Sequence, residues 1–98
     1  MLINTSKRRP NRERVRQIKA ALTAALDLSE DATIMVTELE CLEEGCPPVE
    51  TVIALLRSDS PTVQYKVHKS TDELDDNDLV HACETWGLSV REPIRLAT

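Results

Sequence analysis

Aromatic side chains are nearly absent from this 98-residue chain, which has no phenylalanine, one tyrosine (Tyr65) and one tryptophan (Trp86). Proteins that bind single-stranded nucleic acid use aromatic side chains as platforms on which bases stack, and this sequence has almost none. The core must therefore be aliphatic. Hydrophobic residues make up 41% of the chain and charged residues 30%, a balance typical of a globular domain.

Long apolar runs are also absent, and glycine is scarce. No stretch approaches the roughly 18 apolar residues of a membrane-spanning helix, and the N-terminus has no apolar segment of the secretory kind. We therefore expect a cytoplasmic protein that does not associate with membranes. Because Gly45 and Gly87 are its two glycines, the chain has no glycine-rich loop to hold phosphates, which argues against nucleotide-dependent catalysis.

Charge is divided unevenly along the chain. Residues 1–26 contain seven basic side chains and one acidic one, a net charge of +6, whereas residues 27–98 contain five basic and sixteen acidic side chains, a net charge of -11. Such a division affects partners and association rates rather than the fold.

The first half of the chain contains one helical pattern and one strand pattern. Apolar residues recur every three or four positions from residue 11 to residue 26, which predicts an amphipathic helix; they are Val15, Ile18, Leu22, Ala25 and Leu26. Asn11 suits the N-cap. Thr33–Glu40 is rich in β-branched residues and predicts a strand, followed by a loop over Cys41–Pro48 that contains two prolines.

The second half predicts two more strands and a second helix. Thr51–Arg57 is a continuous apolar run typical of a buried strand. After a turn at Asp59-Ser60-Pro61, alternating residues from Val63 to Val67 predict a half-exposed strand. The acidic tract Ser70–Asp78 has two helix-start spacings, Ser70-x-x-Glu73 and Asp75-x-x-Asp78. The helix that follows has an apolar face made by Leu79, Val80, Cys83 and Trp86, and Gly87 is its expected stop.

These elements predict an α+β domain of order α-β-β-β-α. The simplest arrangement is a three-stranded antiparallel meander with both helices packed on one face. We expect residues 1–10 to form a flexible basic arm and residues 11–98 to form the single domain.

The element order resembles that of the double-stranded RNA-binding domain, a family that holds phosphate with a lysine cluster at the start of its second helix. Here the corresponding segment, Asp72–Asp78, is acidic and would repel a duplex, because phosphate contacts supply most of the affinity for nucleic acid. The sequence therefore argues against membership of that family.

The charged residues predict a protein-binding surface. Arg12, Arg16 and Lys19 have helical spacing and form one stripe, which the preceding basic residues extend; these are Lys7, Arg8 and Arg9. Glu43 and Glu44 in the Cys41–Pro48 loop are candidate contacts of opposite charge. We expect a small non-catalytic binding or adaptor domain whose partner is another protein. A nucleic acid is the less favoured partner, a second copy is an alternative, and an ordinary solvated helix flank would explain the same stripe.

The cysteines support an alternative function. Cys41 and Cys46 have a C-x4-C spacing, and with His68 they offer ligand types suited to zinc; the same pair could also form a redox disulfide. Free thiols without a special task are the simpler interpretation. Because neither His68 nor His81 has a nucleophile or an orienting acid nearby in the sequence, no catalytic site is complete, and we expect neither an enzyme nor a bound cofactor.

Overall fold

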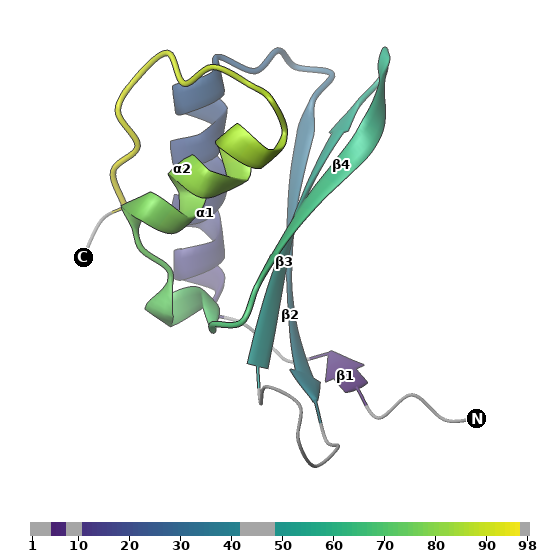
Figure 1. Cartoon of the computed structure of the whole chain (residues 1–98), viewed down its shortest axis with the longest axis vertical. Helices are drawn as coiled ribbons and strands as arrows, with labels where there is room; N and C mark the ends of the chain where they lie inside the picture. The colour runs from purple at the N-terminus through teal and green to yellow at the C-terminus, as the bar shows by residue number, and fades with distance from the viewer. Residues whose placement is uncertain (1–4, 8–10, 42–48, 97–98) are drawn as a thin grey trace.

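The computed structural model describes residues 5–7, 11–41 and 49–96 as one antiparallel sheet with two helices on one of its faces (Figure 1). The elements are β1 (Thr5–Lys7), α1 (Arg12–Leu26), β2 (Thr33–Cys41), β3 (Val49–Arg57), β4 (Ser60–Val67), the 3-10 turn η1 (Thr71–Glu73) and α2 (Asp76–Thr85). The strand order is β1-β2-β3-β4. The predicted α+β meander is confirmed, with the short β1 added at one edge.

Helix α1 begins and ends at recognisable caps. The Asn11 side chain accepts hydrogen bonds from the backbone N–H groups of Glu13 (3.0 Å) and Arg14 (3.3 Å), as its predicted N-cap role requires. The helix ends at Leu26, and Asp27 then adopts a left-handed conformation with φ 51°. Glycine usually occupies such a position because its missing Cβ removes the steric cost.

The sheet register places alternate residues on opposite faces. Ile34, Ile53 and Leu55 are buried on the face under the helices, and the register aligns Ile34 with Leu55. The hairpin turn between β3 and β4 is Ser58–Asp59, so the predicted turn at Asp59-Ser60-Pro61 is wrong by one residue at its start and two at its end. Pro61 lies in β4 instead, because an edge strand tolerates a residue without a backbone N–H.

The acidic tract starts helices as predicted. The Ser70 N–H donates to the Glu73 carboxylate of η1 (2.9 Å), and Asp75 and Asp78 bond each other's backbone N–H groups (3.0 Å each) at the start of α2. Gly87, with φ 73°, stops α2 as expected. Its N–H and that of the next residue bond carbonyls in the last helical turn (3.0 Å each).

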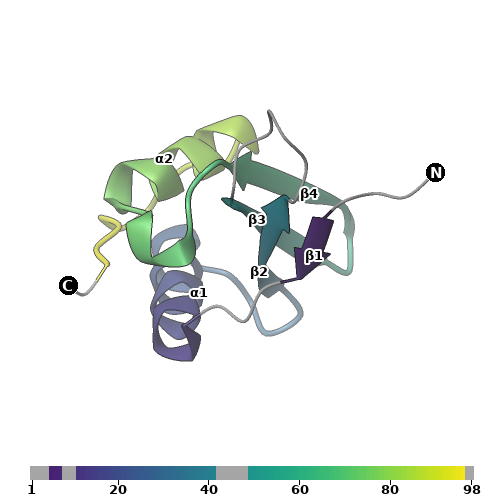
Figure 2. The same cartoon turned by 90° about the horizontal axis from the view of Figure 1, so that it is seen from below.

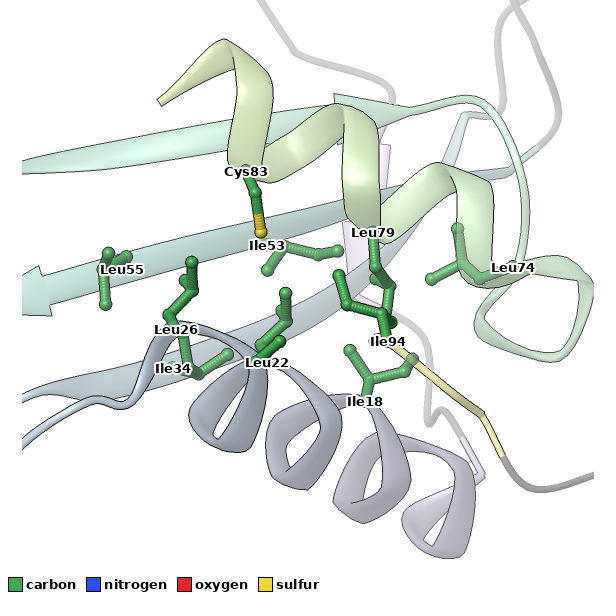
Figure 3. Close-up of a cluster of buried hydrophobic side chains, with 11 residues drawn as sticks. Ile18, Leu22, Leu26, Ile34, Ile53, Leu55, Leu74, Leu79, Cys83 and Ile94 are labelled. Carbon is green, nitrogen blue, oxygen red and sulfur yellow. The ribbon is translucent and has the colours of Figure 1, made fainter. Parts of the chain in front are cut away.

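The core lies between the helices and the sheet (Figure 3). It is aliphatic, as the composition required, and its fully buried side chains include Ile18, Leu22, Ile53, Leu55 and Leu79. Each of the two helices and the central strands contributes to this cluster. The helical periodicity and the apolar run identified in the sequence therefore mark the true core.

The segment predicted as a flexible arm contains β1, which the sequence did not suggest. Thr5–Lys7 pairs antiparallel with the end of β2, with Lys7 opposite Leu39 and Thr5 opposite Cys41. Residues 1–4 and 8–10 lie outside the described residues, so the flexible-arm hypothesis stays a prediction.

Candidate functional site

The basic and acidic segments of the sequence belong to two helices that pack over different strands. Helix α1 packs on β2, which also carries β1, whereas α2 packs on β4 at the other side of the sheet. Figure 2 shows α1 and β1 toward one edge of the sheet and α2 toward the other. The basic α1 and the acidic α2 therefore pack over different strands, but the first turn of α1 lies next to the acidic tract, where Arg14 donates to the Leu74 carbonyl and Asn11 donates to Asp72.

The predicted basic stripe is on the surface of α1. Arg12, Arg16 and Lys19 are all exposed, and we call these three residues the basic flank. Arg16 makes an ion pair with Glu13 at 3.0 Å, but the two side chains are 74% and 64% exposed, so the pair contributes little stability. Arg12 and Lys19 make no ion pair with the residues described.

Of the other predicted partner-binding residues, the structure describes only Lys7. Lys7 lies in β1, where its backbone pairs with β2. Arg8, Arg9, Glu43 and Glu44 lie outside the described residues, so their partner-binding role stays a prediction.

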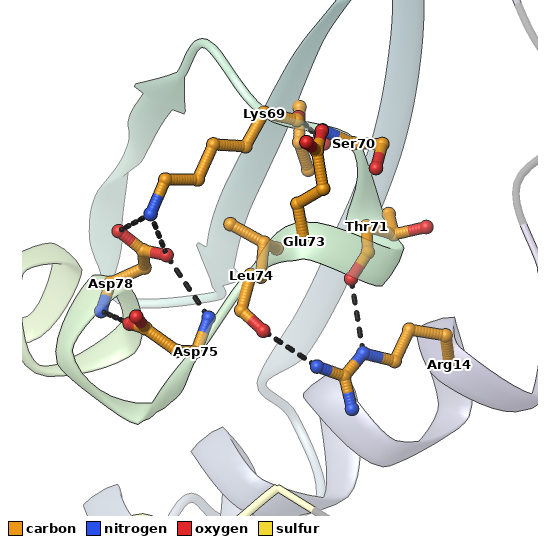
Figure 4. A network of polar contacts seen from close by, with 9 residues as sticks. Arg14, Lys69, Ser70, Thr71, Glu73, Leu74, Asp75 and Asp78 are labelled. Carbon is orange, nitrogen blue, oxygen red and sulfur yellow. Dashed lines mark hydrogen bonds and ion pairs between the residues drawn. The ribbon is translucent and has the colours of Figure 1, made fainter. Parts of the chain in front are cut away.

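The acidic residues around α2 are used by the fold itself (Figure 4). Besides capping α2, the Asp78 carboxylate pairs with the Lys69 ammonium at 3.0 Å. The Asp76 carboxylate accepts the Leu96 N–H at 2.8 Å, which ties the C-terminal segment to the helix start. Asp72 accepts a longer hydrogen bond of 3.4 Å from the Asn11 side chain. The acidic run at the start of α2 therefore has an intramolecular role.

These contacts also shift the pKa values of three of the side chains involved. The hydrogen bond from the Ser70 N–H lowers the pKa of Glu73, and the hydrogen bond from the Asp78 N–H lowers the pKa of Asp75. The hydrogen bond to Asp78 raises the pKa of Lys69. The folded state thus favours the charged form of each of these side chains.

Arg14 is a structural residue that the sequence analysis overlooked. Its Nε donates to the Thr71 carbonyl (3.0 Å), and an Nη donates to the Leu74 carbonyl (2.6 Å), so one half-buried guanidinium joins α1 to η1. Glu38, 3% exposed, accepts the Thr71 N–H at 2.7 Å from the sheet side. Arg14 falls four residues before Ile18, so its place near the apolar face was a usable signal.

The thiol and histidine candidates are not assembled into a site by the described residues. Antiparallel pairing puts the end of β2 and the end of β4 at one end of the sheet, so Cys41 and His68 share that end. Cys46 lies outside the described residues, and no group of three or more metal-ligating side chains occurs within them. The metal and redox functions stay predictions. His68 and His81 are both exposed.

Cys83 differs from the other thiols because it belongs to the core. It is fully buried between α2 and the sheet. Burial raises the pKa of this thiol, and a protonated, inaccessible thiol is a poor nucleophile. Cys83 is therefore a packing residue.

The face of the sheet away from the helices carries an apolar stripe that the sequence analysis did not single out. Alternation and register assign five apolar residues to this open face: Met35 and Leu39 of β2 and Val52, Ala54 and Leu56 of β3. Met35 is 48% exposed, and the other four are half-buried. No helix of the described chain covers this face (Figure 2).

Polar side chains border the apolar stripe. Gln64 and Lys66 of β4 lie opposite Ala54 and Val52 in the register, and both are exposed. Glu50 of β3 lies opposite Leu39 at the other end of the stripe. An apolar centre with a polar border is the usual anatomy of a protein interface.

Comparisons of the chain with protein-family models, with curated proteins and with solved structures found no match. Among the described residues, neither helix has the length and apolar character that crossing a membrane requires.

Proposed function

We propose that this chain is a non-catalytic protein-binding domain, and that it docks its partner on the apolar stripe of the open face. The observation that carries the proposal is the exposure of Met35 (48%) on a sheet face that no described helix covers. Contiguous exposed apolar surface is uncommon on monomeric proteins and marks interaction sites. Each Å² of apolar surface removed from water contributes about 25 cal/mol, so burying this stripe would favour association.

The chemistry of the partner follows from the charges around the stripe. The stripe lies on β2 and β3, and the basic flank of α1 lies on the β2 side of the same domain. A partner that covers the stripe and extends past the β2 edge meets positive charge there. We therefore infer a partner protein with an apolar patch bordered by acidic residues, since complementary charge favours encounter and orientation.

A second copy and a nucleic acid are less well suited to this surface. Each copy carries a net charge of -5, so two copies repel each other at low ionic strength. A duplex would gain from the basic flank but would meet the carboxylates at the start of α2, and an apolar stripe offers nothing to phosphate. A different protein is the partner that uses both features.

Site-specific photo-crosslinking tests the proposal. We would replace Met35 by a photoreactive amino acid on the open face and, as the matched control, place the same group at His81, which is exposed on α2. The expected result is one adduct with another protein from position 35, none from position 81, and loss of the adduct in the Arg12→Glu, Arg16→Glu, Lys19→Glu variant. A self-adduct, an RNA or DNA adduct, or equal adducts from both positions would contradict the proposal.

A further inference from the structure

The ends of α1 and α2 lie at one end of the molecule, away from the two helix starts (Figure 1), and residues at these ends line a small cavity. Its volume is about 240 Å³. Its apolar lining consists of three leucines, Leu26, Leu28 and Leu88. The rest of the wall consists of Arg57, Gly87, Ser89 and Arg91. The residues come from the end of α1, the end of β3 and the segment after α2, so the cavity exists only in the folded chain.

Arg57, one of the lining residues, carries an unsatisfied donor. Its Nε is buried, and it has no hydrogen-bond partner among the residues described. A buried N–H without an acceptor loses its hydration without replacing it, and the cost is larger for a charged group. An acceptor that enters the cavity would remove this cost.

The helix ends do not supply that acceptor. The backbone N–H groups of Asp27 and Leu28 bond the carbonyls of the last turn of α1, and Gly87 and Leu88 do the same for α2. The Arg91 N–H bonds the Ala25 carbonyl at 2.6 Å, which fixes the Arg91 backbone beside the cavity. Arg57 makes no side-chain hydrogen bond to these carbonyls.

Acidic side chains are absent from the described lining of the cavity. Asp31, at the same end of the molecule, accepts hydrogen bonds from Ser29 and from Ser58 (2.5 Å to the latter). These two hydroxyls lower the pKa of Asp31. Hydrogen bonds from uncharged groups therefore stabilise its negative charge. Asp27 and Glu92 line a neighbouring cavity together with Arg91, without an ion pair to it among the residues described.

We propose that this cavity binds a carboxylate attached to a short aliphatic group. The Arg57 guanidinium pairs with the carboxylate, Arg91 adds a second positive charge, and the three leucines cover the aliphatic part. A planar guanidinium matches the two oxygens of a carboxylate. The apolar lining disfavours inorganic phosphate, which would lose hydration there without an apolar contact in return.

NMR titration of the folded protein tests this assignment directly. The probes are N-acetyl-leucine, which represents a peptide C-terminus, 4-methylpentanoate, which represents a free aliphatic acid, N-acetyl-leucinamide and inorganic phosphate. We expect both carboxylates to shift the Arg57 Nε–H resonance, and the amide and phosphate to leave it unchanged. The carboxylate that binds more tightly identifies the natural ligand as a peptide C-terminus or a free aliphatic acid.

Variants of the two arginines complete the test. Arg57→Met and Arg91→Met are each expected to weaken carboxylate binding at least tenfold, whereas Lys66→Met, which removes an exposed cation on the open face, leaves it unchanged. Arg91 is exposed, so its variant remains informative if Arg57→Met unfolds. Equal shifts from the amide, tighter binding of phosphate, or unchanged carboxylate affinity in the folded arginine variants would overturn the proposal.

Discussion

Replacing Arg14 by methionine removes the guanidinium that joins α1 to η1 while keeping the length of the side chain and its helix propensity. The hydrogen bonds lost include the two to η1 and its C-terminal neighbour, one from Nε to the Thr71 carbonyl at 3.0 Å and one from an Nη to the Leu74 carbonyl at 2.6 Å. Hydrogen bonds that involve a charged group contribute about 1.5–3 kcal/mol each. Because Arg14 is only half-buried and solvent weakens both bonds, we expect less than the sum of two such bonds, a loss of about 2–3 kcal/mol in the free energy of unfolding.

Denaturation in urea, followed by Trp86 fluorescence, measures this loss. Arg16→Met is the matched control, since Arg16 is two residues away on the same helix but 74% exposed in a surface ion pair. Its cost should stay below about 0.5 kcal/mol. Arg14→Lys should fall between the two, because an ammonium keeps the charge but lacks the planar fork. If Arg14→Met and Arg16→Met agree within about 0.5 kcal/mol, the junction between α1 and η1 does not depend on Arg14.

Three further predictions concern the core, a helix end and pH. Ile53→Ala should lower the free energy of unfolding by about 2–5 kcal/mol in the same denaturation assay, because Ile53 is fully buried. Asp27→Gly should raise it by about 0.5–1 kcal/mol, since glycine adopts positive φ without strain and removes an acid from a helix C-terminus; a lower stability would count against this. The lowered pKa values of Glu73 and Asp75 mean that stabilisation is present above their usual values of 4.5 and 3.8 and is lost as pH falls through the folded-state values. The double variant Glu73→Gln, Asp75→Asn should therefore lose less stability on acidification than the wild type, and an equal loss would contradict this.

Local patterns in the sequence were sufficient to predict most of the fold. The three- and four-residue spacing around Ile18 and Leu22 located α1 to within one residue of its start. The spacing of Ser70 with Glu73 identified a helix start because both capping partners lie within one turn of each other. Such features depend on neighbouring residues, so no knowledge of long-range contacts was needed.

Features that depend on distant contacts were missed. β1 is three residues long and is defined by pairing with residues 39–41, more than thirty positions away. Pro61 was read as a turn residue because its edge-strand position became evident only from the strand order. The cavity beside Arg57 joins three segments far apart in the chain. Sequence spacing does not show which distant segments line the same cavity.

In the candidate site, too, local features could be predicted from the sequence and features that depend on distant contacts could not. The sequence placed the basic flank correctly because helical spacing is local. The spacing of Asp75 and Asp78 likewise predicted a helix start, and in the structure these two residues cap α2. The apolar stripe could not be recognised because Met35 and Ala54 become neighbours only through the register of β2 and β3.

The affinity for the partner captured through position 35 tests the central claim most directly. Isothermal titration would compare the wild type with Met35→Glu, which places a charge on the apolar stripe, and with His81→Glu, which adds the same charge to the exposed surface of α2. Binding through the open face predicts at least a tenfold loss of affinity for Met35→Glu and wild-type affinity for His81→Glu. Equal affinities of the two variants, with Met35→Glu folded as judged by its unfolding transition, would contradict a docking surface on the open face.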